Sequence, residues 1–202
     1  MQDSPAEFPR EATSVKRIWP LLMALLLLTG CGSGKYASGL HHAQIDVKDY
    51  GTIVLELDGD TAPISVANFC ALAEDGFYDG LTFHRVIPGF MIQGGDPKGD
   101  GSGGSKKTIA GEFSANGVDN PISHVRGTVS MARSQDFNSA SSQFFIVHED
   151  SPSLDGQYAA FGHVTQGMDV VDAICESTPV EDGNGTVAWW NQPVISQIRI
   201  LD

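Results

Sequence analysis

The feature that most constrains the fold is a succession of short apolar runs, from Leu81 onward, separated by Gly, Asn, Asp and Pro. Apolar runs of this length, bounded by turn residues, are typical of short strands. The runs are LTFHRVI, FMIQG, GTVSMA, SQFFIVH, YAAFGHV and, last in the chain, PVISQIRIL. So many short strands predict a mainly β fold, either an antiparallel barrel or a sandwich.

An earlier strand and two helices complete the predicted fold. In the stretch YGTIVLELDGD, three apolar residues alternate on one face before a turn: Ile53, Leu55 and Leu57. Thr61 can cap a helix that contains an early Pro63 and ends at Gly76. The residues with helical spacing in it are Val66, Phe69, Cys70 and Ala73. A second helix is expected after Gly167, with Val170, Val171 and Ile174 on one side.

The N-terminus has the pattern of an export signal. Lys16 and Arg17 precede IWPLLMALLLLTGC, an apolar run shorter than the roughly 20 residues that cross a bilayer as a helix. Its end, Leu28 to Cys31, resembles the bacterial lipobox, in which a lipidated Cys becomes the new N-terminus. We therefore expect a signal peptide over residues 1–30 and a lipid on Cys31. The alternatives are a plain signal peptide with a chance Cys, or an uncleaved anchor.

The rest of the chain is expected to hold a short tether and one domain. Residues 31–44 are rich in Gly and Ser and lack periodicity, so we predict a flexible tether in which His41 and His42 are exposed linker residues. The domain is then residues 45–202, a normal length for a single domain. Cys70 and Cys175 lie in apolar helical patterns, so we favour two free buried thiols over a disulfide.

Charge and motifs exclude several classes of function. The formal net charge of -13 argues against nucleic acid as a partner. The stretch GDGSGG, from Gly99, fits G-x-G-x-x-G but is not followed by a helix pattern, so a surface loop is expected. Asp96, Lys98 and Asp100 do not make a calcium loop, because Lys stands at the third position and no Glu closes the site. No nucleophile motif is evident.

Several long motifs, in order and with matching spacing, give the chain a resemblance to a known family. The motifs are FHRVIPGFMIQGGD, GSGG, GEFSANGVDNPISHVRGTVSMARS, SSQFFIV and LDGQYAAFGHV. From about Tyr50 to the C-terminus, the chain resembles the cyclophilin family of peptidyl-prolyl cis-trans isomerases. This resemblance implies a closed eight-stranded antiparallel barrel capped by two helices. It also implies rotation of the peptide bond before proline, without cofactor or metal.

The resemblance also implies a site, carried over residue by residue. Arg85 matches the catalytic Arg, which donates a hydrogen bond to the imide nitrogen once the bond is twisted. Gln93 matches the residue that supports this Arg and the substrate. The apolar proline pocket and the wall that holds the peptide correspond to Phe90, Met91, Phe145 and Leu154, and to Ala132, Arg133 and Gln143, with Gly101 in the adjoining loop and Tyr158 at the rim.

Three positions depart from the eukaryotic pattern of the family. Ser153 stands where a Trp is common, Tyr158 where a rim His is common, and Arg133 where an Asn is common. Because Arg85 and the apolar pocket are retained, catalysis is expected, while the match to cyclosporin is expected to weaken. Main-chain contacts at Arg133 carry over better than side-chain contacts.

The leading hypothesis is therefore an exported, lipid-anchored monomer that isomerises Xaa-Pro bonds in extracytoplasmic proteins. Its expected partners are proline-containing polypeptides and, through the lipid, the outer face of the cytoplasmic membrane or the cell envelope. The main alternative is a non-catalytic module that binds proline peptides or holds unfolded chains, which would tolerate the loss of Arg85. A substrate-capture lipoprotein of a transporter is disfavoured, because such proteins are usually larger and two-lobed.

Overall fold

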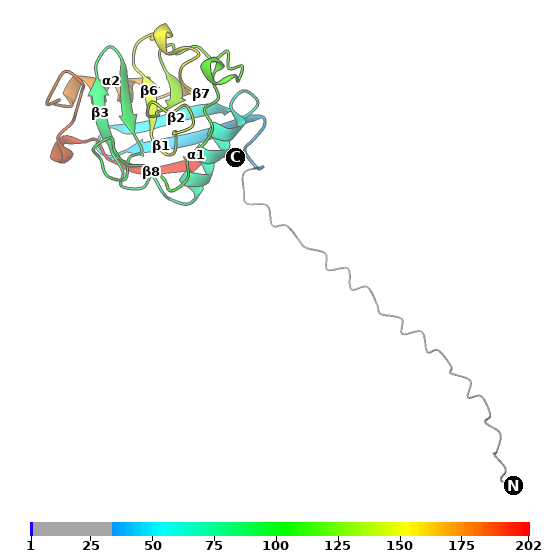
Figure 1. The fold of residues 1–202 in the computed structure, drawn as a ribbon. Helices are drawn as coiled ribbons and strands as arrows, with labels where there is room; N and C mark the ends of the chain where they lie inside the picture. Colours follow the sequence, from blue (N-terminus) through cyan, green and yellow to red (C-terminus); the bar gives the residue numbers. More distant parts are fainter. Residues whose placement is uncertain (2–33) are drawn as a thin grey trace.

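The computed structural model describes Met1 and residues 34–202. Eight antiparallel strands form one sheet that curls around a core, and two helices pack against it (Figure 1). The strands are β1 (Leu40–Val47), β2 (Gly51–Asp58), β3 (Phe83–Ile87), β4 (Met91–Gly94), β5 (Thr128–Met131), β6 (Phe144–Val147), β7 (Ala160–Gln166) and β8 (Ile195–Ile200). The helices are α1 (Pro63–Glu74) and α2 (Met168–Ser177), with short 3-10 turns at Ser114–Asn116, Pro152–Leu154 and Trp189–Asn191.

The order of strands across the sheet is β3-β4-β6-β5-β7-β2-β1-β8. β3 and β8 stand at its two ends, and no continuous ladder joins them among the described residues. Two contacts link the start of β3 to the segment just before β8. They are an isolated bridge between Thr82 and Val194 and a hydrogen bond from the Phe83 N–H to the Pro193 carbonyl. The mainly β, eight-stranded antiparallel fold with two helices is confirmed, whereas full closure of the barrel stays a prediction.

The core lies inside the curled sheet. Ile53, Leu55 and Leu57 are fully buried, as their alternation predicts. Phe69 of α1 enters this core and packs edge-on against Phe144 of β6, with ring centroids 5.4 Å apart. The predicted inner faces of both helices are also buried. Cys70 and Cys175 are free and buried, as expected.

The start of α1 differs from the prediction. The N-cap residue is Ala62, and the Thr61 hydroxyl donates to Asp58 instead of capping the helix. The first N–H groups of the helix are satisfied by the buried carboxylate of Glu112, which accepts from the Ile64 N–H at 2.9 Å and the Ser65 N–H at 2.7 Å. A distant carboxylate has taken the place of a local cap, which local sequence patterns cannot reveal.

The predicted tether over residues 31–44 is wrong in its second half. β1 begins at Leu40 and pairs with both β2 and β8, so residues 40–44 belong to the sheet. Tyr36, four residues earlier, is 1% exposed. His41 is no free linker residue either, because its Nδ1 lies 2.5 Å from an Asp202 carboxylate oxygen and its Nε2 lies 2.9 Å from the Ser38 carbonyl. Pairing on two sides stabilises this segment despite its weak apolar pattern.

Two predictions fall outside the described residues: the signal peptide over residues 1–30 and the lipid on Cys31. Among the described residues, α1 with 12 residues and α2 with 10 are both too short to cross a membrane as helices.

Candidate active site

The candidate site lies on the outer face of β3, β4 and β6. Successive residues of a strand point to opposite faces, so the inward Ile92 and Ile146 alternate with outward neighbours. The register places Arg85 opposite Gln93 and Gln93 opposite Phe145. One guanidinium, one amide and one aromatic ring therefore lie side by side across three strands.

An apolar cluster forms the floor of this face, separate from the main core. Met91, Phe145 and Val147 are its buried members, and Phe90, Ala132, Leu154 and Tyr158 pack against them. The Phe145 ring is held on two sides. The Tyr158 ring meets it edge-on at 5.8 Å, and the His124 ring stacks on it at 5.9 Å.

His124 supports Phe145 from within the protein. It is 1% exposed, its Nδ1 lies 2.9 Å from an Asp155 carboxylate oxygen, and its Nε2 lies 3.0 Å from the Ser130 hydroxyl. Burial lowers the pKa of His124 and outweighs the opposing effect of Asp155. The ring is therefore a neutral support for the apolar floor.

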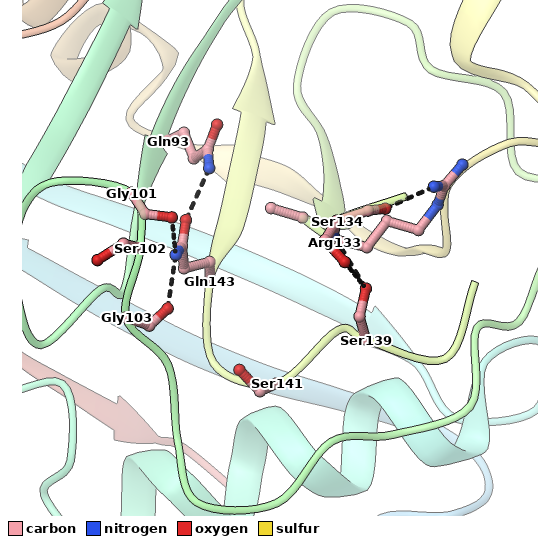
Figure 2. A pocket seen from close by; sticks show the side chains of 10 residues that line it. Gln93, Gly101, Ser102, Gly103, Arg133, Ser134, Ser139, Ser141 and Gln143 are labelled. Atoms are coloured by element: carbon pink, nitrogen blue, oxygen red, sulfur yellow. Dashed lines mark hydrogen bonds between the residues drawn. The ribbon is translucent and has the colours of Figure 1, made fainter. Parts of the chain in front are cut away.

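A chain of hydrogen bonds holds Arg85 at the edge of the apolar floor. Its Nε donates to the Asn184 carbonyl at 2.7 Å, and its Nη1 donates to Gln93 Oε1 at 3.2 Å. Gln93 Nε2 donates in turn to Gln143 Oε1 at 2.8 Å, as Figure 2 shows. Burial lowers the pKa of Arg85, but a guanidinium stays protonated in proteins.

The far end of this chain is anchored on the loop that contains GDGSGG. Gln143 Nε2 donates to the Gly101 carbonyl at 3.0 Å and to the Gly103 carbonyl at 2.7 Å (Figure 2). The buried carboxylate of Asp96 holds the same loop by accepting from the Lys98 and Gly101 N–H groups. The segment is a loop, as predicted, and its two carbonyls fix which way the Gln143 amide points.

All eleven residues expected in the isomerase site line two adjoining cavities. The apolar cavity, of about 210 Å³, is lined by Arg85, Phe90, Met91, Gln93, Ala132, Arg133, Phe145, Leu154 and Tyr158. The polar cavity, of about 240 Å³, shares Gln93, Ala132 and Arg133 with the first and adds Gly101, Gln143 and several serines. The structure thus brings these residues together in one groove, and their roles stay predictions.

Arg133 has a structural role that its sequence position does not reveal. Its guanidinium lies 4.6 Å from the Tyr158 ring centroid and 4.9 Å from that of Phe137. Its Nε and Nη2 both donate to the Gln157 carbonyl. The side chain therefore fastens the rim segment that carries Tyr158, while the Ala132 N–H donates to the Gln143 carbonyl.

Sequence reasoning missed the loop that holds Arg85. In residues 182–186, the Asp182 carboxylate accepts from the N–H groups of Asn184 and Thr186. Gly185 has a φ of 78°, and a Cβ there would lie 2.3 Å from the Val86 carbonyl oxygen. The stretch EDGNGT does mark a tight turn, but a main-chain acceptor has no residue-type signal, so its contact with Arg85 could not be predicted.

Comparisons with known proteins agree with one another. A family model described as cyclophilin type peptidyl-prolyl cis-trans isomerase/CLD matches residues 42–202. A probable peptidyl-prolyl cis-trans isomerase of Brucella suis biovar 1 is 47% identical over 145 residues, covering 69% of this chain and 74% of the relative. Peptidyl-prolyl cis-trans isomerase A of Dickeya dadantii is 42% identical over 166 residues, covering 80% of this chain and 85% of the relative.

A solved structure is also similar to this chain. It is the cyclophilin type isomerase of Cryptosporidium parvum in the presence of the dipeptide Ala-Pro. The TM-score is 0.70 at 32% identity, and the match covers 80% of this chain and 99% of that one.

Proposed function

Because the chain belongs to the cyclophilin type peptidyl-prolyl cis-trans isomerases, we propose that it rotates Xaa-Pro bonds of extracytoplasmic proteins from a lipid anchor at Cys31. Its class of activity follows from the family. The proposal adds the residues that perform the reaction, the substrates and the location. In this proposal it acts as a monomer with a closed barrel, and its partners are proline-containing polypeptides.

The catalytic part of the proposal rests on one observation: the guanidinium of Arg85 is fixed by hydrogen bonds at the edge of an apolar cavity. A guanidinium has five N–H donors, and Arg85 uses Nε and one Nη1 donor for Asn184 and Gln93, which leaves three. The apolar floor of Met91 and Phe145 suits a proline ring, which has no N–H to satisfy. A proline seated there has its imide nitrogen beside Arg85.

The reaction needs no nucleophile, because no covalent bond is made or broken. Resonance keeps the peptide bond planar, with a barrier of about 18–20 kcal/mol. At the twisted midpoint the nitrogen lone pair is localised and becomes a hydrogen-bond acceptor. Arg85 then donates to an atom that accepts poorly in the ground state, so the contact stabilises mainly the transition state.

One hydrogen bond from Arg85 is too weak to account for catalysis alone, so in this proposal Arg85 acts together with the floor of the groove. A charge-assisted hydrogen bond contributes about 1.5–3 kcal/mol, which corresponds to roughly one or two decades in rate. The rest of the rate acceleration is assigned to the groove. Its apolar residues exclude water, which favours the less polar twisted state, and they hold the ring while the preceding carbonyl turns.

The experiment is an isomerisation assay on short Xaa-Pro peptides. We expect Arg85→Ala to lower kcat/KM by about tenfold or more, since it removes the charge-assisted contact. Arg199→Ala is the matched control, because Arg199 lies on β8 and pairs with Asp46 outside the groove. An Arg85→Ala chain that is folded by circular dichroism and fully active would refute the assigned role. A folded wild-type chain that binds proline peptides but does not isomerise them would instead favour the non-catalytic peptide-binding alternative.

The anchor is tested separately. The apolar run before Cys31, with its lipobox-like end, supports lipidation and cleavage at this residue. We expect the wild-type protein in the membrane fraction and Cys31→Ser in the soluble fraction or unprocessed. Mass spectrometry of the mature N-terminus shows where the chain is cleaved and whether Cys31 carries a lipid. An unmodified Cys31, with cleavage at another position, would contradict the anchor and leave the isomerase proposal standing.

A further inference from the structure

A second cavity lies outside the peptide groove, between α1 and residues 105–109. Its volume of about 530 Å³ is more than twice that of either half of the peptide groove. Ile64, Leu72, Phe77 and Ile109 give it an apolar lining, and Lys106 and Lys107 stand at its edge. None of the residues proposed for isomerisation lines it.

The N-terminal part of the chain reaches the described domain at this cavity. Ala37 is one of its lining residues. Just before it, Tyr36 is buried, and its hydroxyl donates to Glu74 of α1. Five residue steps separate Cys31 from Tyr36, and a chain spans at most about 3.6 Å per residue, or about 18 Å in all. A lipid on Cys31 would therefore hold this face of the domain close to the bilayer.

The charges of this face differ from those of the whole protein. The formal net charge is -13, yet two of the five lysines in residues 34–202, Lys106 and Lys107, line the cavity, and a third, Lys35, lies two residues before the lining residue Ala37. Lys35 pairs with Glu74 at 2.9 Å. Lys106 and Lys107 are exposed and form no ion pair with any residue that the structure describes. The acidic Asp75 also lines the cavity, so the net attraction depends on these two lysines.

We propose that this cavity and its lysine edge form a docking surface for an anionic lipid bilayer. The proposal rests on the lipid anchor at Cys31, because the short connection is what brings the face to the membrane. Lys106 and Lys107 contact the phosphate headgroups, and the exposed side chain of Ile64 enters the interfacial layer. The acidic remainder of the surface is repelled by the same headgroups, so charge sets one orientation of the domain.

The test measures how fast a single engineered thiol reacts with a membrane-impermeant maleimide. The native thiols suit this design, because burial raises the pKa of Cys70 and Cys175 to about 12, and an acylated Cys31 has no free thiol. Ile64→Cys probes the docking surface. Val180→Cys is the control, because Val180 is 43% exposed against 44% for Ile64 and does not line the cavity.

Purified lipidated protein is reconstituted in vesicles of phosphatidylcholine alone or of phosphatidylcholine with phosphatidylglycerol. We expect Ile64→Cys to react about tenfold more slowly in the anionic vesicles than in the zwitterionic ones, with Val180→Cys unchanged. Adding Lys106→Glu and Lys107→Glu should abolish the protection. These two changes should leave isomerase activity intact, which shows that the variant is folded.

Each other outcome overturns the proposal. Equal reaction rates of Ile64→Cys in both vesicles, with the protein still bound, would refute the docking surface and leave the anchor in place. Protection that rises with the protein-to-lipid ratio would assign the face to a second copy of this chain. A protein that carries no lipid on Cys31 and stays off the vesicles would refute the anchor and the docking together, while the activity assay would still report on the isomerase.

Discussion

At the scale of single residues, Gln143 sets the direction of the whole polar chain. Two carbonyls, of Gly101 and Gly103, accept from its amide nitrogen, so its amide oxygen must face Gln93. Gln93 then presents its own oxygen to Arg85. Swapping the amide for a carboxylate keeps the acceptor but removes the donor that fixes it.

We therefore expect Gln143→Glu to lower kcat/KM about fivefold, which corresponds to roughly 1 kcal/mol for the loss of ordered hydrogen bonding. The assay is again Xaa-Pro isomerisation. Gln166→Glu is the matched control, because it adds the same charge at an exposed position at the end of β7. Equal activities of the two variants would show that the polar chain does not orient Arg85.

Sequence reasoning could place residues in the groove but not their partners. Arg85 and Gln93 lie in one contiguous motif, so their proximity follows from a hairpin of two strands. The contact between Arg85 and Asn184 spans 99 residues and uses a main-chain carbonyl. The support of Phe145 by His124 likewise depends on how β5 and β6 pair, which no local pattern encodes.

At the scale of elements, the turn between β3 and β4 is hydrogen-bonded to His148, the residue that directly follows β6. His148 Nδ1 accepts from the Gly89 N–H at 2.9 Å, so the ring proton resides on Nε2, which lies 3.2 Å from an Asp172 oxygen of α2. The His148 N–H also donates to the Phe90 carbonyl at 2.8 Å. This one residue links α2 to the turn that presents Phe90 to the groove.

Removing the ring should loosen that turn. We expect His148→Leu to raise KM for Xaa-Pro peptides about threefold to tenfold with a smaller change in kcat, because in the proposed mechanism Phe90 binds the substrate without touching the reacting nitrogen. Asp172→Asn keeps a partner for Nε2 and should have a weaker effect. If His148→Leu lowered kcat and left KM unchanged, the ring would have a role in the chemical step instead.

The first residues of strand β1 could not be predicted as a strand from the sequence. Ala43, Ile45 and Val47 do alternate and are buried, but only two of them are strongly apolar, and two histidines precede them. Its hydrogen bonds go to β2 and to β8, the last strand of the chain. Long-range pairing therefore decides the structure of a segment whose local composition resembles a linker.

At the scale of the whole molecule, the fold buries two histidines, His84 and His124, and keeps them neutral. His84 is 5% exposed, and neither of its ring nitrogens has a hydrogen-bond partner among the described residues. Burial lowers the pKa of His84 and of His124. In the unfolded chain both groups have the ordinary value near 6.5, so protonation favours the unfolded state.

Acidification is therefore expected to lower the free energy of unfolding. Well above pH 6.5 both histidines are neutral in the folded and the unfolded chain and do not affect stability, whereas on acidification the unfolded chain binds protons that the folded chain resists. We expect the free energy of unfolding, from urea titrations, to fall between pH 7.5 and pH 5.5, and the fall to be smaller in the double variant His84→Gln with His124→Gln. His163→Gln is the control, because that ring is 54% exposed on β7. A double variant with the same pH slope as the wild type would show that these two buried rings do not govern acid stability.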